Sequence, residues 1–460
     1  MVATSLVWFR RDLRLADHPA LLAAADSGDD VVPLFVLDDR LRRPSGAARL
    51  AFLARCLADL DGATNGRLVV RRGDPDKVVA GVAAELEATA VFVSDDFGPY
   101  GRRRDEAVAK ALGDTPFERV GSPYAVDPGE VRTGGGGAYK VFTPFYRAWR
   151  AHGWGPPLPE PAGATTWASG VRSDGPPKEP RGLTASVPPA GEAAAHRRLD
   201  DFLGDIARYR TDRDRPDLDA TSRLSPYLKF GCLHPRQILA RLGRTAGDEK
   251  FRTELAWREF YAEVLWHRPE SARRSLQPAM STMETDTGQE ADRRFQAWAH
   301  GRTGYPYIDA GMRQLLAEAW MPNRVRMAVA SFLVKDLHVD WRRGARWFMA
   351  HLVDGDLASN QHNWQWVAGT GTDPAPYFRI FNPVAQGREH DPDGGYVRRW
   401  VPELAGVPGA AVHEPSRLGG GRYPAPIVDH AAERKVALAR YEAVKKAGRS
   451  RPTGRPSSSR

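Results

Sequence analysis

Short runs of hydrophobic, β-branched residues alternate with longer alanine- and leucine-rich segments in the first part of the chain. The short runs have the length of buried strands and lie at residues 5–9, 31–37, 68–71, 91–94 and 117–120. The segments between them, such as 47–60 and 76–86, have helical spacing. This alternation predicts an α/β fold, a doubly wound parallel sheet of Rossmann-like type with helices on both faces. No strand is followed by Gly-x-Gly-x-x-Gly, so the usual dinucleotide-binding fingerprint is absent.

The pattern changes in the middle of the chain. Residues 128–195 are irregular, and 156–189 are rich in proline and glycine, a composition typical of an interdomain linker. From Glu192 onward the apolar positions have helical spacing almost to the end, which predicts a large all-α domain. We therefore expect an α/β domain at 1–130, a linker at 131–195, a helical domain at 196–446 and a disordered basic tail at 447–460.

Composition narrows the class of protein. The chain has 460 residues, 42% hydrophobic and 27% charged, which is enough for two domains with large cores. It has no apolar run long enough to span a bilayer and no signal-peptide pattern at its start, so we expect a cytoplasmic protein without a membrane partner. The two cysteines, Cys56 and Cys232, cannot supply a disulfide framework, a four-cysteine zinc site or a cysteine-ligated iron–sulfur cluster. We expect no metal site.

The net charge of +9 and the pI of about 9.6 favour a polyanionic partner. The arginines are spread along the whole chain, however, and an arginine-rich coding bias would produce the same balance. Charge alone leaves nucleic-acid binding and this neutral explanation equally open.

The stretch from Asp354 to Trp366 carries the most specific chemistry. If it is helical after the Asp-Gly turn, Asp356, Asn360 and Trp364 fall on one face, and Trp366 lies about 200° round from Trp364. A carboxylate, an amide and an indole on one face suit a planar heteroaromatic ligand. Taken singly, the same residues would be a helix cap and two core tryptophans.

As a whole, this stretch closely resembles the flavin-site signature of the photolyase/cryptochrome family. The matching text continues through 369–373 and 376–383, and Trp8 to Leu15 opens the chain as it does in that family. The resemblance extends from Trp8 to Tyr441 and is strongest to class I members. It implies an N-terminal antenna-chromophore domain and a helical domain that holds FAD in a folded conformation.

The resemblance also implies a function. Class I members repair DNA by transferring an electron from photoexcited, reduced FAD to a cyclobutane pyrimidine dimer, which is flipped out of the duplex, as is known for photolyases. The expected partner is DNA containing such dimers, and we expect a monomer. The main alternative is a cryptochrome-like flavin photosensor without repair activity. A DNA-binding protein that does not use light is a further alternative, and it predicts a colourless protein.

The cofactor-binding residues follow from local pattern and from the resemblance. Hydroxyls and backbone N–H groups at Thr221 to Ser225 precede a helix, where they would form an anion site or a plain helix cap. In the family, the matching sequence binds the flavin diphosphate. We expect Arg326 to pair with Asp354, because a lone buried carboxylate is costly. The full expected set is Tyr209, Thr221, Ser222, Arg223, Leu224, Ser225, Arg326, Asp354, Asp356 and Asn360.

Glu254 and Trp257 share a helix face at i, i+3 spacing, and on their own would be a surface carboxylate and a core indole. In the family, the matching residues hydrogen-bond the damaged pyrimidines and pack against them, and Trp366 forms a second wall. No histidine lies in the region where members that repair (6-4) photoproducts carry one. The expected DNA-contacting residues are Glu254, Trp257, Arg258, Asn323, Arg324, Met327, Trp366 and Arg379, with a solvated surface charge as the alternative for Arg324 and Arg379.

Trp364 and Trp341 match the inner two members of the tryptophan chain through which the family photoreduces its flavin. The third would lie near Gly288, where the sequence has no tryptophan, so we predict slow or rerouted photoreduction. The resemblance assigns catalytic roles to Glu254, Asn360, Trp364 and Trp341. Asn360 would tune the reduced flavin, and Glu254 would stabilise the dimer radical anion.

Asp96 and Arg102 follow a predicted strand, at the edge where open α/β sheets bind ligands. The text around them is more similar to members that bind 8-hydroxy-5-deazaflavin than to those that bind methenyltetrahydrofolate. A solvated strand-to-helix turn would explain these residues equally well.

Overall fold

The N-terminal sheet has the parallel topology that the hydrophobic pattern predicts. The computed structural model describes residues 3–161, 165–372, 378–418 and 423–449, and its five parallel strands have the order β3-β2-β1-β4-β5. They are β1 (Thr4–Phe9), β2 (Asp30–Leu37), β3 (Val69–Arg72), β4 (Val91–Val93) and β5 (Phe117–Arg119). Each strand begins and ends within one residue of its predicted range, so the predicted fold class is confirmed.

Helices cover both faces of this sheet, because successive side chains of a strand point to opposite sides. Leu6 and Trp8 of β1 pack in a core with α4 (Pro75–Glu85) and α5 (Pro99–Ala111). Val7 and Phe9 pack in a larger core on the other face, with α1 (Pro19–Asp26) and α3 (Ala47–Ala63). The short helix α2 (Asp39–Arg42) follows β2. The larger core continues into the second half of the chain.

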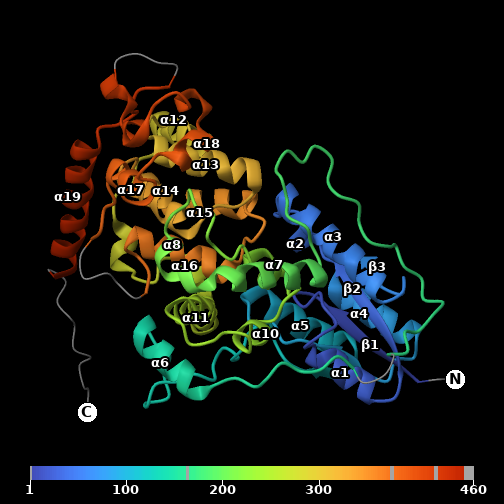
Figure 1. Cartoon of the computed structure of the whole chain (residues 1–460). Helices are drawn as coiled ribbons and strands as arrows, with labels where there is room; N and C mark the ends of the chain where they lie inside the picture. The colour runs from blue at the N-terminus through green and yellow to red at the C-terminus, as the bar shows by residue number, and fades with distance from the viewer. Residues whose placement is uncertain (1–2, 162–164, 373–377, 419–422, 450–460) are drawn as a thin grey trace, which may run out of the picture.

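The second half is helical, as the spacing of its apolar residues predicts (Figure 1). Its helices are α7 (Glu192–Asp205), α8 (Tyr209–Asp212), α9 (Ser225–Phe230), α10 (Pro235–Leu239), α11 (Ala246–His267), α12 (Gly288–Ala299), α13 (Pro306–Glu318), α14 (Asn323–Lys335), α15 (Trp341–His351), α16 (Leu357–Ala368), α17 (Pro383–His390), α18 (Gly395–Trp400) and α19 (His430–Arg449). α19 continues past residue 447, where we expected a disordered tail to begin. The rest of that tail, 450–460, lies outside the described residues.

The segment expected to be a linker, 131–195, contains the helix α6 (Phe142–His152) and the first residues of α7. Phe142, Phe145 and Trp149 are its buried residues and lie on one face at helical spacing. This amphipathic pattern is short and lies among proline and glycine residues, so the sequence did not predict the helix. After α6 the chain runs back past the sheet, where Ala168 N donates to Val31 O at 2.9 Å, before it enters α7 (Figure 1).

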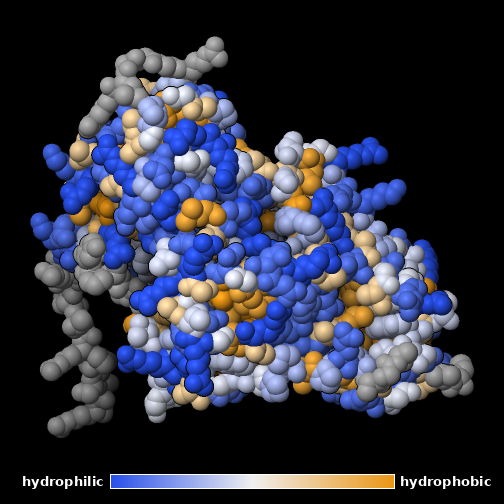
Figure 2. All heavy atoms as spheres, in the orientation of Figure 1, coloured by the Kyte–Doolittle hydropathy of each residue, from blue (hydrophilic) through white to orange (hydrophobic). Residues whose placement is uncertain are grey.

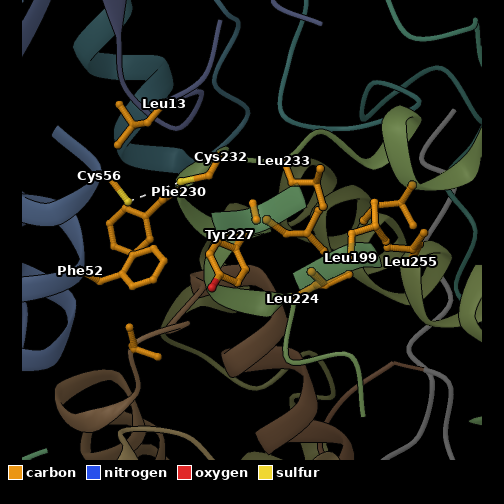
Figure 3. Close-up of a cluster of buried hydrophobic side chains, with 14 of the residues drawn as sticks. Leu13, Phe52, Cys56, Leu199, Leu224, Tyr227, Phe230, Cys232, Leu233 and Leu255 are labelled. Atoms are coloured by element: carbon orange, nitrogen blue, oxygen red, sulfur yellow. Dashed lines mark hydrogen bonds between the residues drawn. The ribbon is translucent and has the colours of Figure 1, made fainter. Parts of the chain in front are cut away.

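The two domains share one continuous core. Figure 3 shows Phe52 and Cys56 of α3 facing Tyr227 and Phe230 of α9 and the following Cys232. The two cysteine Sγ atoms lie 3.4 Å apart as buried free thiols. The N-terminal domain is therefore packed against the helical domain through apolar side chains and is not merely tethered to it.

Gly231 shows how closely the two backbones approach. Its φ is +71°, and a Cβ at this position would lie 1.9 Å from the carbonyl oxygen of Arg11. Leu13 N also donates to Phe230 O at 3.1 Å. Glycine is therefore required both for the left-handed turn that ends α9 and for the contact with the N-terminal motif. This contact brings Arg11 to the edge of the helical domain.

Figure 2 shows a mainly hydrophilic face on which hydrophobic residues form small, separate patches. Among the helices of the described residues, none has both the length and the apolar character needed to cross a membrane.

Candidate functional site

One cavity of about 450 Å³ brings together most of the residues that the sequence assigns to cofactor and to DNA. From the expected cofactor set it is lined by Tyr209, Thr221, Ser222, Arg223, Ser225, Arg326, Asp354 and Asp356. From the expected DNA set it is lined by Glu254, Trp257, Arg258, Asn323, Met327 and Trp366. These residues come from α8, α9, α11, α14, α16 and the loops between them.

Asn360 and Trp364 lie in an adjoining hollow of about 80 Å³. This hollow also contains Asp354 and Asp356, so the two spaces share a wall. Asp356 caps α16 by accepting a hydrogen bond from Ser359 N at 3.0 Å, which confirms that the helix begins after the Asp-Gly turn. The carboxylate, amide and indole predicted to share one helix face therefore do line one space. Leu224 is fully buried and lines neither space.

Asp356 is held as a carboxylate by cations from two domains. Arg11, from the N-terminal domain, donates to its Oδ2 at 2.8 Å. Burial opposes the charged form, but the charges of Arg11, Lys229 and Arg258 outweigh it, so the pKa of Asp356 lies well below its usual value. Burial, together with the charge of Arg11, lowers the pKa of Lys229 to about 7. An ionised carboxylate beside a lysine thus forms one wall of the cavity.

Asp354 is the second carboxylate of the site, and it is buried. Arg326 donates to it at 2.8 Å and 3.3 Å, which confirms the expected pair. Ser225 Oγ donates to the same carboxylate at 2.6 Å, and Trp320 Nε1 donates to Ser225 Oγ at 3.3 Å. The pair is therefore fixed to the start of α9 as well as to α14.

The loop 221–225 presents hydroxyl groups to the cavity. Arg198 binds the carbonyl oxygens of Ser222 and Thr221 at 2.8 Å and 3.0 Å, so these carbonyls are already engaged outside the cavity. Arg223 has a φ of +51° and lies over the ring of Trp320 at 4.3 Å. The hydroxyl oxygen of Thr221 is buried and has no hydrogen-bond partner among the described residues. A buried hydroxyl in this position is suited to an oxygen-rich ligand.

The opposite part of the cavity is aromatic. Trp257 and Trp366 both line it. Phe142 of α6 stacks on Trp257 with ring centroids 3.6 Å apart and an interplanar angle of 8°. Glu254 accepts from Arg213 at 2.5 Å and pairs with Lys250 at 2.9 Å, so its carboxylate is balanced by two cations. Asn323 is exposed and donates to the Met327 sulfur at 3.6 Å.

The three arginines expected at DNA differ in their surroundings. Arg258 donates to the carbonyl oxygens of Pro123 and Leu228 at 3.0 Å and 3.3 Å. Arg324 pairs with Asp214 at 2.7 Å. Arg379 is exposed and lies in a small hollow with Trp366. Contact of any of them with DNA remains a prediction.

The two predicted electron donors, Trp364 and Trp341, do not line the main cavity. Trp364 is 2% exposed and packs edge-on against Phe348 and Trp298, with centroid distances of 5.0 Å and 6.2 Å. Trp341 is the first residue of α15 and is 6% exposed. Gly288, where the third tryptophan would be expected, is exposed and has a φ of +82°. That backbone conformation disfavours any side chain, so the departure extends to the local fold.

The expected antenna residues make protein contacts. Asp96 pairs with Arg104 at 3.1 Å and accepts from Gly98 N at 3.0 Å. Arg102 lies over the ring of Trp266 in α11, 4.1 Å from its centroid. A chromophore at these residues also remains a prediction.

The sequence reading missed Arg11, Lys229 and Phe142 as parts of the site. Arg11 lies inside the Trp8–Leu15 motif and Lys229 lies four residues after Ser225, but Arg11 and Asp356 are 345 positions apart, and only the folded chain brings them together. Phe142 lies in the segment whose composition indicated a linker.

The chain matches known proteins over both halves. Residues 5–162 match the family model described as DNA photolyase, and 251–443 match the model described as FAD binding domain of DNA photolyase. A deoxyribodipyrimidine photo-lyase from Streptomyces griseus is 43% identical, with 96% of this chain and 99% of that protein covered. One from Halobacterium salinarum is 41% identical, with 95% and 98% covered.

Solved structures agree with these matches. A bacterial class III photolyase from Agrobacterium tumefaciens has a TM-score of 0.90 at 37% identity, covering 97% of this chain and 98% of that chain. An archaeal photolyase from Sulfolobus tokodaii with two FAD molecules has a TM-score of 0.84 at 30% identity, covering 96% and 100%. A cryptochrome from Synechocystis sp. PCC6803 has a TM-score of 0.85 at 28% identity, covering 95% and 99%.

Proposed function

The chain belongs to the DNA photolyase family, and from this premise we propose that it repairs DNA by splitting cyclobutane pyrimidine dimers in light. It is an enzyme, a carbon–carbon lyase, and its cofactor is FAD. Its relatives named deoxyribodipyrimidine photo-lyase are more similar in sequence than the cryptochrome, which favours repair over a photosensor.

One observation carries the proposal. A single cavity joins the residues expected to hold the flavin, such as Asp356 and Ser225, to the wall expected to receive a lesion, formed by Glu254, Trp257 and Trp366. Electron transfer between two bound partners requires that they lie close together, and a shared cavity provides this. A photosensor would need only the first group of residues.

The residues present fit FAD. The orphaned hydroxyl of Thr221, with the neighbouring serines, suits the diphosphate, and the ionised Asp356 would accept from the imide of the flavin ring. Asn360 and Trp364 would face the ring from the adjoining hollow. When bound in its reduced form and excited by light, FAD would supply the electron for the repair. The carboxylate of Asp354, neutralised by Arg326, would add no net charge beside the cofactor.

The substrate side would work through shape and hydrogen bonds. Trp257, backed by Phe142, and Trp366 would pack against a dimer flipped out of the duplex. Glu254 would hydrogen-bond the pyrimidines and stabilise the dimer after it gains an electron, while Arg213 and Lys250 fix its position. Arg258, Asn323, Arg324, Met327 and Arg379 complete the proposed DNA contacts, and the net charge of +9 supports a polyanionic substrate.

Finer features are part of the same proposal. We propose a second, antenna chromophore near Asp96 and Arg102, with 8-hydroxy-5-deazaflavin favoured over methenyltetrahydrofolate. The second FAD molecule in the Sulfolobus structure belongs to that protein, and it makes a flavin-type chromophore a reasonable competitor. We further propose a cytoplasmic monomer with the domain limits given above.

The test is light-dependent loss of cyclobutane dimers from an irradiated oligonucleotide. Chemically reduced protein is used, so that the missing tryptophan cannot mask activity. Repair in light and none in the dark is the expected result, and a Trp257→Ala variant should bind FAD normally but repair poorly. If FAD is bound and reduced yet the dimers persist in light, the repair proposal fails and the photosensor alternative takes its place.

A further inference from the structure

A second cavity, of about 440 Å³, lies against Trp341. It is formed by residues 268–285, the end of α14, the start of α15 and one face of α19. It shares no lining residue with the cavity proposed for FAD and DNA. Nothing in the proposed repair reaction uses it.

This cavity occupies the region where the predicted electron chain breaks off. The segment before Gly288 lies against the turn that leads to Trp341, because Asp286 N donates to His338 O at 2.8 Å. Thr285 lines the cavity, and nothing lies within 4 Å of the position that a Cβ on Gly288 would take. The predicted tryptophan chain therefore ends at Trp341, which lines this cavity, because no third tryptophan is present at position 288.

The lining carries an excess of positive charge. It includes the cations Arg268, Arg274, Lys335, Arg342 and Arg440 and the carboxylates Glu270, Glu284 and Asp340. Arg268 and Arg342 pair with Glu270 and Asp340, and Arg440 pairs with Asp286 and Glu284, which leaves Arg274 and Lys335 as the cations without a carboxylate partner among the described residues. Arg274 is exposed and forms no ion pair with any residue that the structure describes. An anion would enter this cavity more readily than a cation.

Lys335 is the buried member of this group. It is 4% exposed, donates to the carbonyl oxygen of Arg379 and lies 4.5 Å from the centroid of the Phe378 ring. It forms no ion pair within the described ranges, and the adjacent Asp336 is paired with His430. Burial lowers the pKa of Lys335 to about 7. A buried ammonium without a carboxylate partner is costly, and a bound anion would remove that cost.

Much of the remaining wall is apolar. Met280, Val334, Val339, Ala368 and Trp341 line the same space as Lys335, together with the polar residues Ser275, Ser281, Thr285, His338 and Thr370. A wall of this kind favours an organic anion with a flat, partly apolar body over a small inorganic ion.

We propose that this cavity binds a small organic anion, such as an enediolate, which donates one electron to Trp341. In this step the donor is oxidised by one electron, and a Trp341 indole that has passed an electron to Trp364 is restored. An enediolate monoanion oxidised in this way also loses its remaining enediol O–H proton, which passes to water; no other bond is formed or broken. The inference rests on the proposed function, because it assigns Trp341 to the electron chain of the family. A soluble donor would replace the third tryptophan.

Ascorbate is the probe, and binding is measured first in the dark by calorimetry on the FAD-loaded protein. Light-driven reduction of the flavin is then followed at increasing ascorbate concentration. We expect a saturable rate whose half-saturation matches the dark dissociation constant. Uncharged hydroquinone should give a rate that rises linearly over the same concentrations.

Lys335→Met should weaken ascorbate binding at least tenfold and raise the half-saturation concentration equally, with hydroquinone unaffected. Lys77→Met, which removes an exposed lysine of α4, is the matched control and should change neither value. Trp341→Phe should retain dark binding but lose the saturable reduction. If Lys335→Met does not fold, Ala437→Phe narrows the same cavity from α19 and should weaken binding without removing a charge.

The proposal is overturned if ascorbate does not bind in the dark, or if it binds equally well to wild type, Lys335→Met and Ala437→Phe. Repair by chemically reduced protein bypasses the cavity, so Lys335→Met should still split dimers. Failure of wild-type repair with intact ascorbate binding would instead refute the proposed function.

Discussion

Replacing Arg11 by methionine should weaken FAD binding, although Arg11 belongs to the N-terminal domain. Its guanidinium donates to Asp356 at 2.8 Å, and the side chains of the pair are 25% and 13% exposed. Without Arg11, the effect of burial would be opposed less strongly and the pKa of Asp356 would rise, and a neutral carboxyl accepts a weaker hydrogen bond from the flavin imide than a carboxylate does. Arg11→Met should therefore destabilise the FAD-bound protein relative to the FAD-free protein.

The size of the effect lies between two limits. Removing one partner of a fully buried ion pair costs about 3–5 kcal/mol, whereas an exposed pair contributes about 0–1 kcal/mol. The Arg11–Asp356 pair is partly exposed, and Asp356 keeps the Ser359 N–H bond and the nearby charges of Lys229 and Arg258. We therefore expect about 1.5–3 kcal/mol, which corresponds to a dissociation constant for FAD about 10- to 100-fold higher.

The assay is titration of the flavin-stripped full chain with FAD, followed by flavin fluorescence. Arg72→Met is the matched control, because Arg72 pairs with Asp39 at 2.9 Å in the same domain but is 56% exposed. It should leave FAD affinity unchanged, and Arg11→Lys should recover part of the affinity. FAD binding by Arg11→Met within twofold of wild type would show that this pair does not hold Asp356 for the cofactor.

Three further predictions concern catalysis, electron supply and pH. Glu254→Gln should lower the repair yield several-fold while FAD remains bound, whereas Glu249→Gln, on the same helix, should have no effect; an unchanged yield would remove Glu254 from the mechanism. Trp341→Phe should slow light-driven flavin reduction at least tenfold without affecting repair by chemically reduced protein, and fast reduction in this variant would place the electron route elsewhere. Folding lowers the pKa of Asp356, so the native state binds fewer protons than the unfolded state as the pH falls. The ionised Asp356 therefore contributes its full stabilisation above about pH 4, and this contribution is lost as the pH falls further. Wild type should therefore lose more thermal stability between pH 5 and pH 3 than Asp356→Asn, and equal losses would contradict the assignment.

The sequence predicted the elements, the motifs and the Arg326–Asp354 pair, but not the contacts between the two domains. Strands β1, β2 and β4 were predictable because each is a short apolar run bounded by turns, and the start of α16 because Asp-Gly precedes Asp356. The Arg326–Asp354 pair was predictable from the cost of a lone buried charge. The contact of Arg11 with Asp356 depends on how two domains pack, which no local pattern encodes. Helix α6 was missed because its short apolar face lies within a proline- and glycine-rich segment.

Helix α11 explains why the N-terminal domain matters even when no antenna chromophore is bound. One part of the helix carries Glu254 and Trp257 into the cavity. One turn further on, Glu259 accepts hydrogen bonds from Ala125 N at 2.6 Å and from Trp149 Nε1 at 2.6 Å.

Glu263 accepts from Gly129 N at 2.6 Å, and Trp266 of the same helix lies under Arg102 of α5. The position of the lesion wall is therefore fixed by contacts with the N-terminal domain and with the segment that joins it to the helices. Because Phe142 of α6 also supports Trp257, loosening these contacts should move the wall relative to the flavin site. Glu259→Gln should accordingly lower affinity for dimer-containing DNA more than affinity for FAD, as measured by parallel titrations. An equal loss of both would indicate that α11 does not transmit the effect.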